Sequence, residues 1–349
     1  MSTAQRFIYD QAPLRVYWEV TRACDLACRH CRAEAASTAH RDELTTAEAF
    51  KLFDRLATFD PKPHIVLTGG DPLKRSDLFD LITAAQLRAL KVSVSPSATP
   101  LLTPEVIVRL RGWGVEAISL SLDGATAQTH DAFRGFSGTF ERTLVAAAIA
   151  DGVGLPVQVN TLVAAETLTD LPAIYGLVRD LKVARWSLFF LIGVGRGELM
   201  QPVSARQAEA VMRWVARLQT GRKPIVTTTE APHYRRVVQT IGGRGKGHAG
   251  GVRDGNGILF ISHTGDITPA GFLPLAAGNV RCDDVVKIYR HAPLFQALRN
   301  PEGFGGRCGH CEWRYECGGS RARAYAAAGD PLAEDPLCGY LPGGVTTPA

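Results

Sequence analysis

Three cysteines near the N-terminus carry the clearest chemistry in this 349-residue sequence. Cys24, Cys28 and Cys31 are spaced CxxxCxxC and directly follow an apolar, strand-like run at residues 14–20. This spacing gathers three thiolates around one point on a short loop, and soft thiolate ligands favour zinc or an iron–sulfur cluster. A structural zinc ion normally takes four protein ligands, so three cysteines leave one position open for an exogenous ligand. Three structural cysteines or a lone zinc loop are the alternatives.

A second group of cysteines lies near the C-terminus. Cys308, Cys311 and Cys317 form a CxxC pair followed by a third cysteine, and Cys338 is a more distant fourth. Four ligands complete a closed site, and taken alone such a pattern is typical of zinc. Cys282 is left over, and we expect it to be a buried structural thiol.

The N-terminal motif resembles the cluster loop of the radical S-adenosylmethionine (radical SAM) superfamily. In that family three cysteines bind three irons of a [4Fe–4S] cluster, and the methionine end of SAM chelates the fourth. An electron from the cluster cleaves SAM to a 5′-deoxyadenosyl radical, which abstracts hydrogen from the substrate. The resemblance therefore implies that Cys24, Cys28 and Cys31 are the catalytic cluster ligands.

Strand and helix patterns alternate between residues 14 and 219. Six such units predict an α/β fold with a parallel sheet wrapped by helices. The number agrees with the partial (βα)6 TIM-type barrel that the resemblance implies. Ligands in such barrels bind at the carboxyl ends of the strands, where the cysteine loop falls. The strand-like runs span residues 14–20, 64–68, 91–95, 115–122, 155–163 and 185–192, and the helical patterns span residues 45–58, 76–90, 103–112, 138–151, 169–182 and 204–219.

A glycine-rich motif follows the second strand. Gly69, Gly70, Asp71 and Pro72 resemble the Gly-Gly-Glu-Pro motif that holds the SAM amino group in the superfamily. Paired glycines allow close approach of the backbone, and a carboxylate accepts hydrogen bonds from an ammonium group. Asp71 is one methylene shorter than the usual glutamate, so its reach to SAM is an open question.

Two further strands offer polar side chains at the same edge of the sheet. Ser121 and Asp123 end the fourth strand in a stretch resembling radical SAM enzymes with a C-terminal cluster domain, where they would line the SAM and substrate mouth. Asn160 shares one face of the fifth strand with Gln158 and is the candidate for the SAM ribose. The alternatives are an ordinary Asx-type turn and a core amide.

With this barrel upstream, the second cysteine group resembles the SPASM domain, which holds auxiliary [4Fe–4S] clusters. The positions aligned with ligands of a nearer auxiliary cluster lack cysteine, as at Ala270 and Ser320. We therefore predict one auxiliary [4Fe–4S] cluster, with zinc as the alternative, to orient substrate or pass an electron. Its ligands would be Cys308, Cys311, Cys317 and Cys338.

The C-terminal stretch at residues 317–340 is similar to radical SAM enzymes of haem d1 synthesis and of the alternative haem pathway. Those enzymes act on propionate or acetate side chains of iron tetrapyrroles. A carboxylate-bearing substrate would need arginines, whose planar guanidinium binds carboxylates through two hydrogen bonds. The candidates are Arg134, Arg196, Arg235, Arg236, Arg321 and Arg323.

The chain divides by composition into five predicted segments. They are an N-terminal segment at 1–13, the radical SAM core at 14–219, a glycine-rich basic linker at 220–255, a SPASM/twitch-like auxiliary domain at 256–342 and a tail at 343–349. A β-hairpin is expected at 257–268 and helix near 283–298.

Charge and hydropathy restrict the partners. The net charge of +5 is too modest for a nucleic-acid footprint, and no apolar run is long enough to cross a bilayer. The N-terminus has no apolar signal-peptide region, so we expect a cytoplasmic protein whose thiols stay reduced. A reducing partner such as flavodoxin or ferredoxin is expected.

The predicted function is radical SAM chemistry on a tetrapyrrole, by oxidative decarboxylation or side-chain modification. The alternative within this class is a SPASM-type enzyme that modifies a peptide or protein. From a different class, the chain could be a non-catalytic iron–sulfur electron carrier or a zinc-stabilised scaffold. A carrier needs neither an open iron nor a methionine site, which the CxxxCxxC and Gly-Gly-Asp-Pro motifs together indicate.

Overall fold

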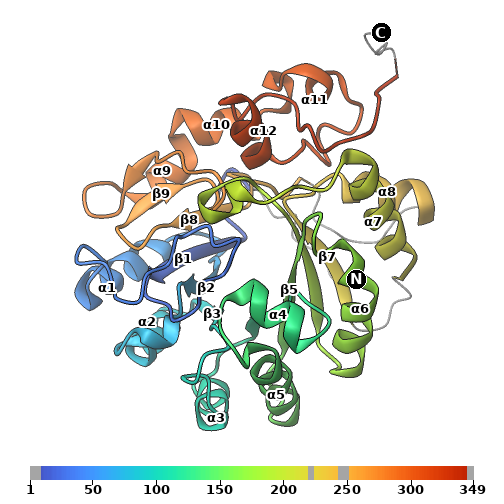
Figure 1. The fold of residues 1–349 in the computed structure, drawn as a ribbon. Helices are drawn as coiled ribbons and strands as arrows, with labels where there is room; N and C mark the ends of the chain where they lie inside the picture. Colours follow the sequence, from blue (N-terminus) through green and yellow to red (C-terminus); the bar gives the residue numbers. More distant parts are fainter. Residues whose placement is uncertain (1–8, 219–223, 243–250, 344–349) are drawn as a thin grey trace, which may run out of the picture.

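The chain folds around one curled β-sheet with helices on its outer side (Figure 1). The computed structural model describes residues 9–218, 224–242 and 251–343. Ten strands pair in the order β10-β9-β8-β1-β2-β3-β4-β5-β6-β7, and all neighbours from β8 to β7 are parallel. The first seven strands are β1 (Arg15–Thr21), β2 (His64–Gly69), β3 (Lys91–Val94), β4 (Ile118–Ser121), β5 (Val157–Val163), β6 (Arg185–Phe190) and β7 (Ile225–Thr229).

Helices connect the parallel strands, as expected for right-handed βα units. The six predicted strands correspond to β1–β6, so the predicted partial barrel is confirmed. The short helix α4 was not predicted. The connecting helices are α1 (Thr46–Leu56), α2 (Leu78–Leu87), α3 (Pro104–Gly112), α4 (Ala127–Arg134), α5 (Thr139–Gly152), α6 (Leu171–Asp180) and α7 (Ala205–Leu218), with 3-10 turns η1 (Pro72–Lys74), η2 (Leu168–Asp170) and η3 (Gly195–Leu199).

Local sequence fixes the starts of two helices. At α1 the Thr45 side chain accepts the backbone N–H of Glu48, and the Glu48 side chain accepts the N–H of Thr45. This reciprocal capping box satisfies two donors that a helix start leaves open. At α3 the Thr103 side chain accepts the N–H of Val106, and Pro104 occupies the first turn. Both predicted starts are confirmed.

The segment predicted as a linker contains regular structure. β7 pairs in parallel with β6, and α8 (Tyr234–Gly242) follows it. Every residue of β7 is β-branched, which favours a strand over a linker. Residues 219–223 and 243–250 of this segment lie outside the described residues, as do residues 1–8 and 344–349.

The C-terminal part extends the same sheet. β8 pairs with β1 on the edge opposite β7, and its antiparallel pairing with β9 confirms the predicted hairpin. In Figure 1 the last helices lie beyond β8 and α8, on one side of the barrel. The elements are β8 (Ile258–Ile261), β9 (Asp266–Thr268), β10 (Gly278–Asn279), α9 (Val285–His291), α10 (Pro293–Arg299), η4 (Pro301–Gly303), α11 (Gly306–His310) and α12 (Arg321–Ala328).

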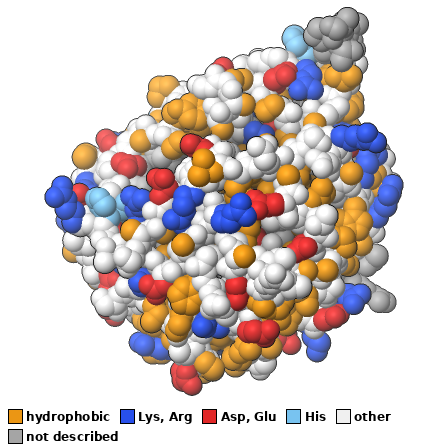
Figure 2. All heavy atoms as spheres, viewed as in Figure 1, with side chains coloured by type: hydrophobic (Ala, Val, Ile, Leu, Met, Phe, Trp, Pro, Cys, Tyr) orange, Lys and Arg blue, Asp and Glu red, His pale blue; other side chains and the backbone are white. Residues whose placement is uncertain are grey.

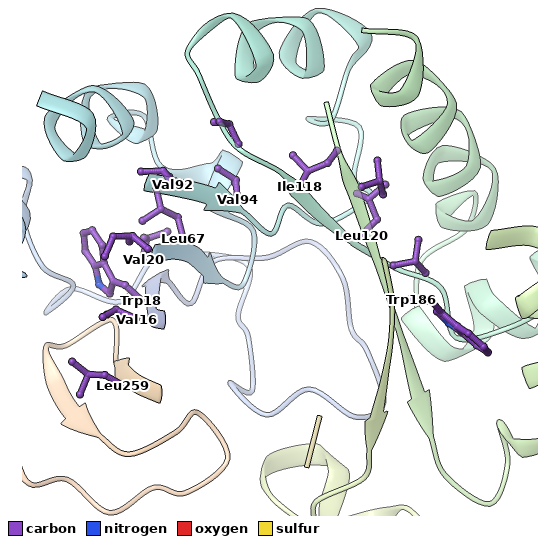
Figure 3. Close-up of a cluster of buried hydrophobic side chains, with 14 of the residues drawn as sticks. Val16, Trp18, Val20, Leu67, Val92, Val94, Ile118, Leu120, Trp186 and Leu259 are labelled. Atoms are coloured by element: carbon purple, nitrogen blue, oxygen red, sulfur yellow. The ribbon is translucent and has the colours of Figure 1, made fainter. Parts of the chain in front are cut away.

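The two faces of the sheet differ in character. Alternate residues of each strand point toward the helices and form the apolar core, among them the fully buried Val16, Trp18 and Leu67 (Figure 3). The intervening residues, such as Tyr17 and Gln158, point into the barrel and are only half-buried. A polar, partly exposed inner face is suited to binding a ligand rather than to packing.

The described residues contain no helix that could cross a membrane. On the face seen in Figure 2, Lys and Arg side chains are interspersed with acidic ones.

Candidate iron–sulfur and SAM site

The CxxxCxxC loop leaves the carboxyl end of β1 and forms a small apolar cluster of its own. Cys24 and Cys28 are buried with Leu26, and the half-buried Cys31 packs against them. The N–H of Leu26 donates to Cys24 Sγ at 3.4 Å, and the N–H of Ala35 donates to Cys31 Sγ at the same distance. Donors of this kind stabilise thiolates and tune iron–sulfur clusters. Burial raises the pKa of Cys24, so a bound metal is needed to hold its thiolate.

The glycines of the Gly-Gly-Asp-Pro motif pack against this loop. A Cβ on Gly69 would lie 2.3 Å from the Thr21 carbonyl oxygen, and one on Gly70 would lie 2.3 Å from that of Ala23. Gly69 also has φ +135°, which favours glycine. The glycines are therefore required for the contact between the end of β2 and the start of the cysteine loop.

The Asp71 carboxylate is fully buried and occupied by internal donors. It accepts the Thr99 hydroxyl at 2.9 Å and the backbone N–H groups of Leu73 and Ser97 at 3.2 and 3.3 Å. Burial raises its pKa, and the Thr99 hydroxyl partly offsets this. The Ser97 hydroxyl, 3.5 Å from Cys24 Sγ, donates to the Gly70 carbonyl oxygen. These contacts join the motif to the cysteine loop, and the role of Asp71 toward SAM stays a prediction.

Replacing Asp71 with alanine is expected to lower the free energy of unfolding by about 2–4 kcal/mol, because the buried Thr99 hydroxyl and two part-buried backbone N–H groups lose their acceptor. Chemical denaturation of the metal-free chain measures this change. Asp180→Ala is the matched control, since the Asp180 side chain is 69% exposed. An Asp71→Ala chain with unchanged stability but weakened SAM binding would show instead that the carboxylate serves the ligand.

Two of the predicted SAM-contacting side chains lie in one row across the inner face. Strand register places Ser121 of β4 beside Asn160 of β5, then Ser187 of β6 and Thr227 of β7. The Asn160 side-chain oxygen accepts a hydrogen bond from Gln158 at 2.8 Å. Ser121 and Asn160 are half-buried, so both are accessible to a ligand inside the barrel.

Asp123, unlike the half-buried Ser121 and Asn160, is buried. Its carboxylate forms an ion pair with the buried Arg134 of α4 and accepts the Leu162 N–H at 2.7 Å. Arg134 also donates to Cys28 Sγ at 3.4 Å. Burial by itself would raise the pKa of Asp123, but Arg134 holds it below its usual value. This pair links the end of β4 to the cysteine loop, a contact that the sequence analysis missed.

Substitution of Arg134 by leucine is expected to lower the free energy of unfolding by about 3–5 kcal/mol, because Asp123 is left as an unpaired buried charge. Asp123→Leu should have an effect of similar size. The double variant should be less destabilised than the sum of the two, since neither charge then remains. Denaturation of all four proteins tests this, and strictly additive changes would contradict the coupling.

The four C-terminal cysteines meet at one cavity. Cys308, Cys311, Cys317 and Cys338 line it together with Asp335. Backbone N–H groups of Trp313, Gly319 and Asp335 donate to the Cys311, Cys317 and Cys308 sulfurs at 3.4 Å each. Burial raises the pKa of Cys317 to about 12 and that of Cys338 to about 11. The prediction that Cys282 is buried is wrong, because it is exposed on the turn after β10.

The chemistry of the two thiol sets fits iron–sulfur clusters. Among the described residues, no three His, Cys, Asp or Glu side chains are arranged to hold a single metal ion. A [4Fe–4S] cluster binds each thiolate through a different iron, so its ligands need not converge on one atom. Both sets have the N–H donors to sulfur that such clusters use.

A buried carboxyl pair that the sequence analysis missed lies against the start of α12. Glu230 follows β7 with φ +57°, a conformation uncommon outside glycine, and Asp254 hydrogen-bonds to it. The Ser320 hydroxyl donates to Glu230 Oε2, and the Ala322 N–H donates to Asp254 at 2.9 Å. Burial, and then Asp254, raise the pKa of Glu230 well above its usual value. The pair ties the end of β7 to α12 beside the second cysteine group.

All six arginines proposed for substrate binding already have internal partners. Each donates to a carboxylate or a backbone carbonyl, which weakens the case that any of them binds substrate. Their partners are Asp123 for Arg134, the Cys28 carbonyl for Arg196, the Glu316 and Val252 carbonyls for Arg235, Glu209 for Arg236, the Pro331 and Ala333 carbonyls for Arg321, and Asp335 for Arg323.

Comparison with known proteins agrees with this arrangement. The Radical SAM superfamily profile matches residues 18–178. The chain is 38% identical over 343 residues to the AdoMet-dependent heme synthase of Methanosarcina barkeri, covering 95% of this chain and 98% of that protein. It is 29% identical to the pre-heme d1 synthase of Dinoroseobacter shibae, covering 93% and 86%. The crystal structure of Streptococcus suis SuiB bound to S-adenosylmethionine superimposes with a TM-score of 0.71 at 16% identity, covering 95% and 78%.

The fold and the thiol-lined loop at the strand ends define an iron–sulfur enzyme built on a partial barrel. The chain belongs to the radical SAM superfamily. It is therefore an enzyme that depends on a [4Fe–4S] cluster and S-adenosylmethionine, and the non-catalytic carrier and zinc scaffold alternatives are set aside.

Proposed function

We propose that this enzyme oxidatively decarboxylates propionate side chains of an iron tetrapyrrole in haem formation. The observation that carries the proposal is the 38% identity to a heme synthase across nearly the full length of both chains. A match of this extent includes both cysteine groups and the barrel between them, rather than the cluster loop alone. The half-buried polar inner face of the sheet supports it, because a polar substrate needs such a surface.

We propose the following roles for the residues of the two cysteine sites and of the inner face. Cys24, Cys28 and Cys31 would hold the SAM-binding cluster, which when bound supplies the electron that cleaves SAM to a hydrogen-abstracting 5′-deoxyadenosyl radical. Gly69, Gly70, Asp71 and Pro72 would form the wall for the SAM methionine, and Ser121 and Asn160 would contact SAM from the inner face. Asp123 would act through Arg134 and the Cys28 sulfur. Cys308, Cys311, Cys317 and Cys338 would hold one auxiliary [4Fe–4S] cluster.

The protein surroundings would protect the reaction. Cys24 and Cys28 are buried, so water has little access to the reacting atoms. Converting a propionate to a vinyl group releases carbon dioxide and removes one hydrogen atom and one further electron from the substrate. The 5′-deoxyadenosyl radical would take the hydrogen atom, and the auxiliary cluster held by the four C-terminal cysteines would accept the electron. A redox partner such as flavodoxin or ferredoxin is proposed as the source of the reducing electron.

The test uses anaerobically reconstituted protein with SAM, dithionite and iron coproporphyrin III. Mass spectrometry follows 5′-deoxyadenosine and the loss of carboxyl groups from the porphyrin together. Decarboxylated product supports the proposal. Formation of 5′-deoxyadenosine without any change in iron coproporphyrin III would overturn the substrate assignment and favour the peptide-modifying alternative.

A further inference from the structure

Two arginines inside the barrel have no hydrogen-bond or ion-pair partner among the residues that the structure describes. Arg15 begins β1 and Arg185 begins β6, and both side chains are half-buried on the inner face of the sheet. Within the described residues, neither guanidinium forms a hydrogen bond, an ion pair or a contact with an aromatic ring. They differ in this from the six arginines considered above, each of which has an internal acceptor.

Arg15 and Arg185 are the first residues of their strands, so in this parallel, curled sheet both side chains lie at the same end of the inner face (Figure 1). β1 and β6 are separated by four strands in the sheet, yet the charge of Arg15 acts on Arg185. Burial, and then the neighbouring Arg15, lower the pKa of Arg185. Two like charges in a partly buried space repel each other strongly, because the effective dielectric constant there is below that of water. An anion between them would remove this repulsion.

Carboxylates on the same inner face are already engaged elsewhere. Glu19, higher on β1, is paired with Arg32 and His263. Glu116 lies 3.5 Å from Lys91 at the outer end of β3. No carboxylate of the described residues forms an ion pair with Arg15 or Arg185, so a bound anion would supply the balancing charge.

The groups around the two arginines suit a carboxylate ligand. Burial, and then Arg15, lower the pKa of His64 to about 4, so this side chain is neutral and bonded to the Ser93 hydroxyl at 2.8 Å. Strand register places Gln158 beside Arg185, and Tyr17 lies on the same inner face. Two guanidinium groups surrounded by neutral donors bind carboxylates through paired, charge-assisted hydrogen bonds.

We propose that Arg15 and Arg185 bind carboxylate groups of the substrate that do not react. The proposal rests on the proposed function and adds to it the residues that select a polycarboxylate. Arg15 lies six residues before Thr21, the residue at which β1 ends and leads into the cysteine loop, which corresponds to about 20 Å along the strand. A flat macrocycle with carboxylates on opposite edges can reach both ends, with one edge at the arginines and the other at the cysteine loop.

The experiment measures binding of iron coproporphyrin III, which has four propionates, to the reconstituted enzyme by absorbance titration. Arg15→Gln and Arg185→Gln are each expected to weaken binding about 10- to 100-fold, because each removes a charge-assisted contact. Arg185→Lys should fall between Arg185→Gln and the unsubstituted enzyme, since lysine keeps the charge but loses the planar pair of donors. Iron mesoporphyrin, with two propionates, should bind less tightly and be less sensitive to both substitutions.

A matched control and a second measurement separate this role from a structural one. Arg111→Gln removes an exposed arginine on the outer helix α3 and should leave porphyrin binding unchanged. Without porphyrin, Arg15→Gln and Arg185→Gln should melt at the same temperature as the unsubstituted enzyme or higher, because a repulsion has been removed.

The outcomes are distinguishable. Unaltered iron coproporphyrin III binding by both glutamine variants would overturn the role of Arg15 and Arg185 and leave the proposed function standing. Weakened binding accompanied by a lower melting temperature without ligand would also overturn it, because the arginines would then be structural. Failure of the unsubstituted enzyme to bind iron coproporphyrin III would overturn the proposed function itself, and this inference with it.

Discussion

Cys28→Ala is expected to abolish the reductive cleavage of SAM, so that 5′-deoxyadenosine falls to the level seen without enzyme. Cys28 is buried and is held in place by two arginines. Its sulfur accepts from Arg134 at 3.4 Å, and its carbonyl oxygen accepts from Arg196 at 2.9 Å. Removing the thiol eliminates one of only three protein ligands, and a cluster with one iron already open does not tolerate this loss.

The measurement combines iron analysis, electron paramagnetic resonance and chromatography of 5′-deoxyadenosine after anaerobic reconstitution. Iron content should fall by about four atoms per chain, because one [4Fe–4S] cluster is lost. Cys282→Ala is the matched control, since Cys282 is an exposed cysteine outside both thiol groups and should change neither iron content nor activity. Undiminished 5′-deoxyadenosine in Cys28→Ala would disprove the assignment of the loop.

Cys317→Ala is expected to separate the two sites, by removing only the outer cluster and leaving basal SAM cleavage. Cys317 lies in the cavity shared with Cys308, Cys311 and Cys338, and its sulfur accepts the Gly319 N–H at 3.4 Å. In the part of the chain that the structure describes, no hydrogen bond joins a residue lining this cavity to a sulfur of the N-terminal loop. The loss should therefore be local, with a packing cost of about 1 kcal/mol for the missing sulfur atom.

Iron should again fall by about four atoms per chain, but 5′-deoxyadenosine should persist while decarboxylated product is lost. The two variants are informative together, because Cys28→Ala should keep the outer cluster and lose the N-terminal one, whereas Cys317→Ala should do the reverse. Loss of both clusters in Cys317→Ala would contradict two independent sites. If Cys317→Ala retained all of its iron and the unsubstituted protein contained a bound zinc ion, the outer site would be a zinc site.

The sequence could predict those features that depend on neighbours along the chain. The cysteine spacing of the N-terminal loop, the capping box of Thr45 and Glu48, and the alternation of strands and helices are all set within a few residues. The six predicted strands accordingly match β1–β6, and Ser121 and Asn160 lie side by side on neighbouring strands. A parallel sheet then brings the strand ends together at one edge.

The roles of charged side chains could not be predicted from the sequence, because they depend on hydrogen-bond and ion-pair partners that are distant along the chain. The six arginines near motifs looked available, but folding gives every one of them an internal acceptor. Asp71 was expected to face SAM, and its carboxylate is held by Thr99 and two backbone N–H groups. Hydrogen-bond partners of a charged side chain are decided by which elements pack against it, and composition and spacing do not contain that information.

The sequence by itself therefore determined the class of chemistry, since the identity and spacing of the cysteines decide which metal centre can form. Only the tertiary structure decided which charges are left without a partner. Arg15 and Arg185 lie 170 positions apart and carry no motif. They become neighbours because the sheet curls until β1 faces β6, and curvature is a property of the packed sheet as a whole.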